Sequence, residues 1–236
     1  MSTMDASEIK RFKEAAAVSA AAQLQDGMVV GLGSGTTATL AVAAIGRRVQ
    51  EGLKIVAIPT SQKTADQARL LNIPLSTLED YAAIDVTIDG ADEVEAGTLN
   101  LIKGGGGNLL REKIVAVASS RMIVVADERK VVSQLGRGVL PIEVVPFGWK
   151  TTAKRLEQVG AHPTFRMRSD GQIFVTDGGH YILDCTFASM RSPRLLQADL
   201  DGIVGVVEHG LFIGIASQAL IGGPSGVRVM DRNAGA

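Results

Sequence analysis

The chain has 236 residues, a formal net charge of −1 at pH 7, 46% hydrophobic residues and a single cysteine, Cys185. This charge provides no broad positive field, so we expect neither nucleic acid nor a membrane surface as a partner. One cysteine excludes an intrachain disulfide and fits a reducing compartment. No apolar stretch approaches the ~18 residues of a membrane span, and the charged start lacks a signal-peptide core, so a cytoplasmic protein is expected.

The first half of the chain alternates helix and strand patterns. Asp5 and Glu8 form a capping pair at the start of the first predicted helix. Apolar strands without polar alternation follow, separated by amphipathic helices, which indicates a parallel sheet covered on both faces. The predicted helices are 5–25, 36–49, 61–71 and 109–118, and the predicted strands are 28–32, 54–58, 84–88 and 122–126.

The pattern changes after residues 135–138. From Pro141 the order is strand, helix, two strands, helix and strand, which is the ferredoxin-like arrangement. The apolar segment 211–229 is expected to return to the first sheet. The predicted fold is therefore α/β: a Rossmann-like doubly wound parallel sheet with an inserted ferredoxin-like α+β lid domain. We place the core at 1–134 plus 209–236 and the lid at 135–208.

A glycine-rich loop, GLGSGTT at 31–37, joins the first strand to a helix. Glycines let the backbone approach a ligand, the helix N-terminus offers free N–H donors, and Ser34, Thr36 and Thr37 add hydroxyls, which suits a phosphate. Two alternatives fit less well. A dinucleotide fingerprint needs G-x-G-x-x-G and an acid after the second strand, and a P-loop needs a Lys before the Ser or Thr. A purely structural turn remains open.

Two carboxylates follow the strand at 84–88, in the segment DGADE at 89–93. Ligands of open α/β sheets bind at the carboxyl ends of strands, which is where Asp89 and Asp92 are expected to lie. Carboxylates accept hydrogen bonds from sugar hydroxyls and can move a proton. An Asx-turn or a helix cap is the structural alternative.

The segment KGGGGNLLREK at 103–113 has four consecutive glycines before a well-patterned helix. Such a run is costly in chain entropy. We interpret it as a backbone nest whose N–H groups point at an oxygen anion, with the charge of Lys103 beside it. Asn108 is predicted to be the N-cap, which places Glu112 near the end of the first turn. An acid there is also favoured by the helix dipole alone.

Together these residues fit an aldose–ketose isomerisation. That reaction needs a base to move a proton between C1 and C2, donors for an enediolate oxygen, and a phosphate anchor. It needs no metal and no nicotinamide, so no cofactor is expected. His162, His180 and His209 are far apart in the chain without metal-ligand spacing, and we interpret them as ordinary lid or surface residues.

The sequence resembles the type A ribose-5-phosphate isomerase family along nearly its whole length. The motifs that carry the resemblance are GLGSGTT (31–37), DGADEV (89–94), KGGGGNLLREKIVA (103–116), VADERK (125–130) and PIEVVPF (141–147).

This resemblance implies Glu112 as the proton-transferring residue, with Asp89 and Lys103 as further catalytic residues. It also implies a homodimer or homotetramer and a place in the non-oxidative pentose phosphate pathway. The resemblance also matches Lys13 to a further lysine on the phosphate side. The substrate-binding residues that it implies are Ser34, Gly35, Thr36, Thr37, Asp89, Gly90, Ala91, Asp92, Lys103, Gly104, Gly105, Gly106 and Lys130.

Two other functions compete with the isomerase. A sugar-phosphate sensor related to transcriptional regulators would carry a helix-turn-helix and a basic face, and neither is apparent. A nucleotide-dependent oxidoreductase is disfavoured by the spacing of the first glycine loop.

Overall fold

The structure is a computed structural model that describes residues 5–190 and 192–232. Its main sheet has six strands in the order β14-β13-β6-β3-β1-β2. All neighbours in it pair in parallel except the edge strand β14, which is antiparallel to β13. The strands are β1 (Val29–Leu32), β2 (Val56–Pro59), β3 (Val86–Asp89), β6 (Met122–Asp127), β13 (Gln218–Gly223) and β14 (Gly226–Asp231).

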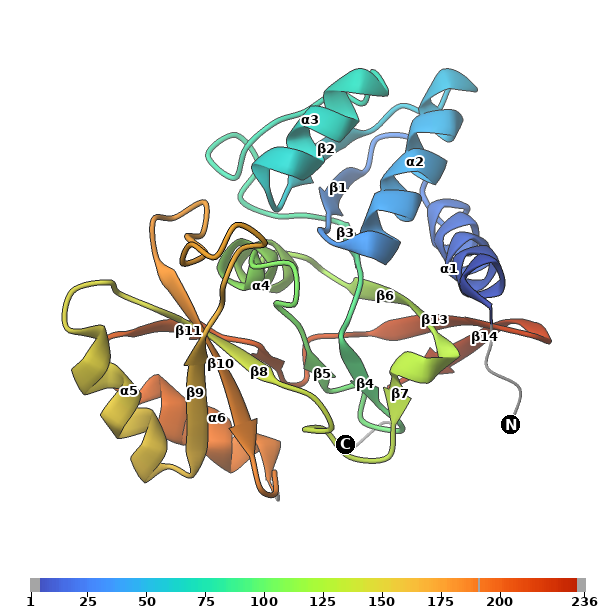
Figure 1. The fold of residues 1–236 in the computed structure, drawn as a ribbon. Coiled ribbons are helices and arrows are strands. Elements are labelled where there is room, and N and C mark those ends of the chain that lie inside the picture. The colour runs from blue at the N-terminus through green and yellow to red at the C-terminus, as the bar shows by residue number, and fades with distance from the viewer. Residues whose placement is uncertain (1–4, 191, 233–236) are drawn as a thin grey trace.

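Both faces of this sheet are covered, as the apolar strands predicted (Figure 1). In β6 the alternate residues Ile123 and Val125 pack into a core with the helices α1 and α2. Met122, Val124 and Ala126 face the opposite core, which includes Ala116 of α4. The helices are α1 (Ala6–Ala21), α2 (Thr36–Gln50), α3 (Gln62–Leu70) and α4 (Leu109–Val117).

The helix starts follow local chemistry in two cases and depart from it in a third. Asp5 and Glu8 form the predicted capping box of α1, although this helix ends at Ala21, before the predicted 25. Ser61 caps α3 through its side chain. Asn108 is the N-cap residue of α4, but its side chain makes no capping hydrogen bond. Its side-chain Nδ2 instead donates to the Gly106 carbonyl at 3.2 Å. The predicted N-cap position is therefore confirmed, although the cap is not made by the side chain.

The second half forms the predicted ferredoxin-like unit. Its antiparallel sheet has the order β11-β8-β10-β9, in which the two outer positions are taken by the fourth and second strands of the unit. Cys185 is buried in β10. The elements are β8 (Leu140–Val144), α5 (Trp149–Gln158), β9 (Ala161–Phe165), β10 (Tyr181–Phe187), α6 (Pro193–Asp201) and β11 (Val206–His209).

A third sheet, which the sequence did not indicate, connects the two units. It has the order β12-β5-β4-β7 and contributes Leu101 and Phe212 to the second core of the main sheet. Segment 211–229 therefore returns to the first sheet only through β13 and β14. Its strands are short, which is why periodicity did not reveal them: β4 (Glu93–Glu95), β5 (Leu101–Ile102), β7 (Val131–Val132) and β12 (Leu211–Phe212).

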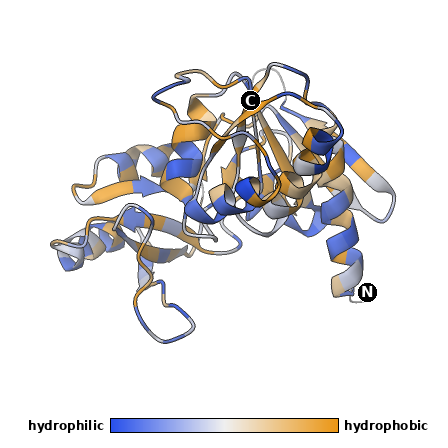
Figure 2. Cartoon of the chain, turned by 90° about the horizontal axis from the view of Figure 1, so that it is seen from above, coloured by the Kyte–Doolittle hydropathy of each residue, from blue (hydrophilic) through white to orange (hydrophobic). Residues whose placement is uncertain are grey.

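Apolar residues concentrate in the strands of the main sheet, whereas the outer helices alternate apolar and polar residues along their length (Figure 2). Within the described part of the chain, no helix combines the length and apolar character needed to cross a membrane.

Candidate functional site

The carboxyl ends of four neighbouring parallel strands bring the candidate site together. In the sheet order β6-β3-β1-β2, these ends lead into residues 128–130, 90–92, 33–35 and 60–61. Open α/β sheets bind ligands at this edge. One pocket there contains all the predicted site residues except Asp89. It is lined by Ser34, Gly35, Thr36, Thr37, Gly90, Ala91, Asp92, Lys103, Gly104, Gly105, Gly106, Glu112 and Lys130.

Close packing explains the first glycine loop. A Cβ on Gly33 would lie 2.1 Å from Asp89 Oδ1, so only glycine lets the carboxylate approach. Asp89 Oδ1 then accepts hydrogen bonds from the Ser34 amide at 3.1 Å and the Gly90 amide at 2.7 Å. Gly35 precedes α2 with φ of +100°, a conformation that other residues adopt rarely. Asp89 thus ties the loop to the neighbouring strand end.

The Ser34 hydroxyl belongs to a buried cluster of four hydroxyls. Its Oγ lies 2.7 Å from Thr60 Oγ1, 2.9 Å from Ser61 Oγ and 3.1 Å from Thr64 Oγ1. Thr60 and Thr64 also donate to the carbonyls of Leu32 and Gly33. A direct contact between this hydroxyl and a phosphate would have to replace these bonds. Sequence reasoning missed the cluster, although the polar run after the second strand was a signal for it.

Three buried charges form the centre of the site, and we call Asp89, Lys103 and Glu112 the cleft cluster. Lys103 Nζ lies 3.0 Å from Asp89 Oδ2 and 3.2 Å from Glu112 Oε2, and it donates to the Gly90 carbonyl at 2.7 Å. The side chains of Asp89, Lys103 and Glu112 are 0%, 3% and 3% exposed. Among the described residues, neither Asp89 Oδ2 nor Glu112 Oε2 has a partner with good hydrogen-bond geometry. Two acids therefore share one ammonium group away from water.

Burial sets the protonation of this cluster. It raises the pKa of Glu112 to about 8, because the pull of Lys103 does not offset the loss of water and the nearby Asp89 charge. It also raises the pKa of Asp89. Burial alone would lower the pKa of Lys103, but attraction to Asp89 and Glu112 raises it, which keeps the ammonium charged. A carboxyl group with a pKa near neutrality is suited to accept and return a proton.

The second glycine loop lies beside this cluster and is partly committed to protein contacts. The Gly105 amide donates to Asp92 Oδ2 at 2.7 Å. Gly104 and Gly107 have φ of +102° and +80°, which favours glycine at both positions. The predicted nest therefore exists as a tight turn, but one of its amide groups already holds a carboxylate.

A positive edge borders the first loop. Lys13 reaches from α1 and donates from Nζ to Thr36 Oγ1 at 3.1 Å, and it lies 3.9 Å from Asp127 Oδ2. Lys130 lines the same pocket from the turn after β6. With the N-terminus of α2, these lysines give this end of the pocket a positive potential.

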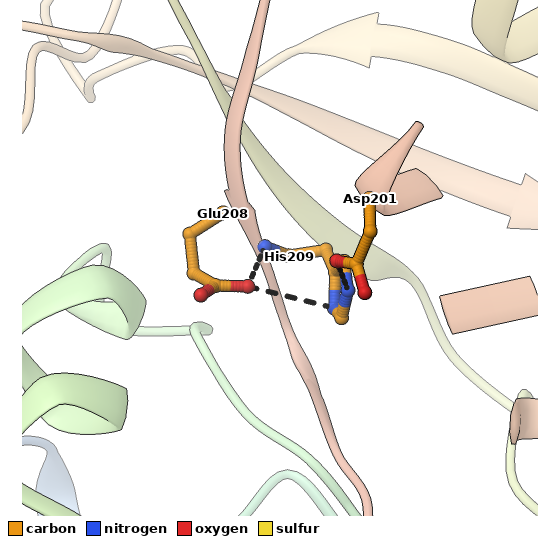
Figure 3. A group of neighbouring side chains, drawn as sticks. All are labelled: Asp201, Glu208 and His209. Carbon is orange, nitrogen blue, oxygen red and sulfur yellow. Dashed lines mark hydrogen bonds and ion pairs between the residues drawn. The ribbon is translucent and has the colours of Figure 1, made fainter. Parts of the chain in front are cut away.

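One of the three histidines, His209, departs from the prediction of ordinary lid or surface residues, whereas His162 is exposed on β9. His209 is 1% exposed and lies beside Asp201 and Glu208 (Figure 3). Each of the three residues offers one atom that could bind a metal ion, and these atoms lie within 4.8 Å of one another. His209 Nε2 is 3.1 Å from Asp201 Oδ1, and its Nδ1 accepts from the Leu211 amide at 3.2 Å. The spacing of residues in the sequence did not predict this grouping, because Asp201 lies at the end of α6 and Glu208 lies in β11.

This grouping is occupied by an internal cation. Lys113 Nζ lies 2.5 Å from Glu208 Oε1 and donates to the His209 carbonyl at 2.8 Å. An ammonium group at that position would repel a metal ion. The group therefore works as a contact between α4 and β11, and we call Lys113, Asp201, Glu208 and His209 the junction cluster.

The fold and the cleft define a class of protein: an α/β enzyme that moves a proton on a small anionic substrate. Residues 56–226 match the family model described as ribose 5-phosphate isomerase A (phosphoriboisomerase A). The ribose-5-phosphate isomerase A of Synechococcus sp. (strain JA-3-3Ab) is 53% identical over 223 residues, covering 94% of this chain and 97% of the relative. The chain belongs to the ribose 5-phosphate isomerase A family.

Solved structures agree with this assignment. Ribose 5-phosphate isomerase A from Methanocaldococcus jannaschii superimposes with a TM-score of 0.91 at 36% identity, covering 94% of this chain and 99% of that one. A D-ribose-5-phosphate isomerase in complex with phospho-erythronic acid gives a TM-score of 0.92 at 36% identity, covering 97% and 100%.

Proposed function

We propose that this protein interconverts D-ribose 5-phosphate and D-ribulose 5-phosphate through an enediolate, without a cofactor. The observation that carries the proposal is the cleft cluster, in which a buried Glu112 with a pKa of about 8 shares Lys103 with Asp89 beside a polar pocket. The relative solved with phospho-erythronic acid supports a sugar-phosphate substrate, because an aldonic acid carries a carboxylate where an enediolate carries its oxygens.

In the proposed reaction, the Glu112 carboxylate takes the proton from C2 of the open-chain aldose. The electron pair of that C–H bond forms the C1–C2 double bond, and negative charge moves to O1. Glu112 then returns the proton to C1, while a proton moves from O2 to O1, which yields the ketose. A positioned base of this kind contributes about 10²–10⁴-fold to the rate.

Lys103 would stabilise the enediolate oxygens, since its ammonium group is already held 3.2 Å from Glu112 Oε2. Asp92 lines the pocket and can accept from sugar hydroxyls. Asp89 is fully buried below the pocket, so we propose that it acts as a positioning residue for Lys103 and the first loop. This revises the expectation that Asp89 itself binds the sugar.

At the other end of the pocket, Gly35, Thr36 and Thr37, with Lys13 and Lys130, would hold the phosphate. We propose an indirect role for Ser34, which ties this loop to the hydroxyl cluster. Phosphate binding far from C1 and C2 can hold the reacting carbons in register with Glu112, so losing it should lower kcat as well as raise KM.

The test compares ribose 5-phosphate with free ribose in an assay for ketopentose phosphate, run with EDTA and without nicotinamide. We expect rapid turnover of the phosphate, very poor turnover of ribose, and competitive inhibition by an aldonic acid 5-phosphate. Equal kcat/KM values for the two sugars, or no competition by the acid, would contradict the proposed site.

Three further expectations belong to the same proposal. We propose that residues 1–134 plus 209–236 form the catalytic core and 135–208 the lid. We also propose a homodimer or homotetramer and a cytoplasmic location. Sedimentation of the purified protein would test the oligomeric state, and fractionation of its source cells would test the location.

A further inference from the structure

Arg166, which follows β9 in the lid, is joined to the second glycine loop. Its Nη1 donates to the Gly104 carbonyl at 2.6 Å and to the Gly105 carbonyl at 3.1 Å. Its Nε donates to Asp184 Oδ2 at 3.0 Å, and its Nη2 forms an ion pair with the other oxygen of Asp184. The Arg166 side chain is only 12% exposed. One guanidinium group therefore links a lid carboxylate to two backbone carbonyls of the core.

These contacts control the direction of two peptide groups. In a planar trans peptide, the C=O and the following N–H point in opposite directions. Since the Gly104 carbonyl faces Arg166, the Gly105 N–H is turned away from it, and it donates to Asp92 Oδ2 at 2.7 Å. By the same geometry, the bond to the Gly105 carbonyl turns the Gly106 N–H away from Arg166.

The Gly106 amide is in the right place to serve the reaction. Gly106 lines the pocket together with Lys103 and Glu112. The Gly105 amide donates to Asp92 and the Gly107 amide donates to the Gly104 carbonyl. Within residues 5–190 and 192–232, the Gly106 N–H has no such acceptor. A backbone donor left free beside a buried base is available to an oxyanion.

Glycine itself cannot fix this orientation. A run of glycines has no side chains to pack, and glycine has more conformational freedom than any other amino acid. The peptide groups at 104–106 must therefore be held by outside contacts. Asp92 holds one side of the loop, and Arg166 holds the other.

We propose that Arg166 is a positioning residue for isomerisation: it fixes the Gly104 and Gly105 carbonyls so that the Gly106 N–H is presented to the enediolate, and Asp184 holds Arg166 in place. This inference rests on the proposed function. It makes the lid a part of the catalytic apparatus, because the lid determines how a donor of the core is aimed.

The test is the variant Arg166→Ala, studied by steady-state kinetics with ribose 5-phosphate. Removing one oxyanion donor costs about 10²–10³-fold in kcat, and loss of its positioning contact should cost about 10-fold or more by the same mechanism. The inhibition constant of an aldonic acid 5-phosphate should rise by a similar factor, whereas that of inorganic phosphate should stay the same. Millimolar guanidinium chloride should restore part of kcat.

Arg168→Ala is the matched control. Arg168 lies two residues further on, its side chain is 58% exposed, and it forms an ion pair with Asp170. It should behave like the wild type and show no response to guanidinium. Arg166→Lys keeps the charge but cannot form all of the Arg166 contacts, so it should fall between Arg166→Ala and the wild type. If Arg166→Ala does not fold, Arg166→Lys provides the test in its place.

Several outcomes would overturn the inference. They are an unchanged kcat in both Arg166 variants, equal weakening of the aldonic acid phosphate and inorganic phosphate, and no rescue by guanidinium in a folded Arg166→Ala protein. Failure of the wild type to convert ribose 5-phosphate would instead reject the proposed function, so the two failures can be told apart.

Discussion

The cleft cluster and the junction cluster use adjacent residues of the same helix, Glu112 and Lys113, but satisfy their charges differently. Both approach Phe212, whose ring centroid lies 5.5 Å from Lys103 Nζ and 5.1 Å from Lys113 Nζ. In the cleft, two fully buried acids share one ammonium group. At the junction, Lys113 has Glu208 and a carbonyl as acceptors, and Asp201 remains 57% exposed to solvent.

This difference separates reactivity from stability. A buried carboxylate without a full set of partners is costly, and its pKa rises until it can exchange protons near neutrality. A charge that keeps its partners serves packing instead: burial lowers the pKa of Lys113, but Glu208 and the His209 carbonyl hold its ammonium group. Burial alone therefore does not mark a functional charge. The mark is burial combined with incomplete satisfaction, which distinguishes Glu112 from its neighbour Lys113.

The largest expected effect comes from Glu112→Gln, which keeps size but removes the base. We expect kcat to fall at least ~10²-fold, with a much smaller change in KM. Steady-state kinetics with ribose 5-phosphate measures this. Near-normal turnover would reject Glu112 as the base, and the cleft cluster would then differ from the junction cluster in charge but not in function.

Lys103→Met should follow closely, because it removes the cation that two buried acids share. Loss of transition-state stabilisation should be on the order of 3 kcal/mol, and affinity for an aldonic acid 5-phosphate should fall too. Kinetics and inhibitor titration give both values. A variant that lost thermal stability alone would show Lys103 to be structural.

The pH dependence should report Glu112 directly. Its folded-state pKa of about 8 lies above the ordinary value of 4.5. Only the ionised form accepts a proton, so kcat/KM should rise about tenfold per pH unit below that pKa and level off above it. The profile should be measured from pH 6.5 to 9.5. A flat profile below pH 7.5 would contradict the raised pKa.

The free energy of unfolding should change with pH in the opposite direction to kcat/KM. Between pH 4.5 and 8 the folded state keeps a proton on Glu112 that the unfolded state releases, so the stability of the wild type falls as pH rises. Glu112→Gln cannot titrate, and its melting temperature should rise relative to the wild type as the pH increases. A difference that does not depend on pH would argue against this linkage.

Lys113→Met should affect stability and spare the chemistry. It leaves Glu208 and the His209 carbonyl without their cation, and a buried polar group that loses its partner costs about 1–3 kcal/mol. Denaturant unfolding measures the loss, and kcat should stay close to that of the wild type. A large fall in kcat with little loss of stability would reverse the roles assigned to the two clusters.

The smallest effect should come from chelation. Since Lys113 occupies the grouping of Asp201, Glu208 and His209, exhaustive dialysis against EDTA should change neither activity nor melting temperature. Restoration of lost activity by a divalent ion would show that this grouping, or another, holds a metal.

The sequence alone predicted the order of the longer helices and strands and the position of the site along the chain, but not the four short strands of the third sheet. Apolar runs between amphipathic helices predicted the parallel sheet, and the strand and helix order after Pro141 predicted the ferredoxin-like unit. Glycine loops and acids at strand ends predicted which segments would meet, because parallel strands end at one edge of their sheet. These features follow from local backbone periodicity, which a sequence displays directly.

Only the tertiary structure decided how the side chains are used. It turned the Ser34 hydroxyl toward Thr60, Ser61 and Thr64, and it buried Asp89 below the pocket. It also brought Arg166 onto the second glycine loop, where Gly104 lies 62 positions earlier in the chain. Such contacts depend on how whole elements pack against one another. No local periodicity encodes that packing, since it is set by the summed shape and burial of many distant residues.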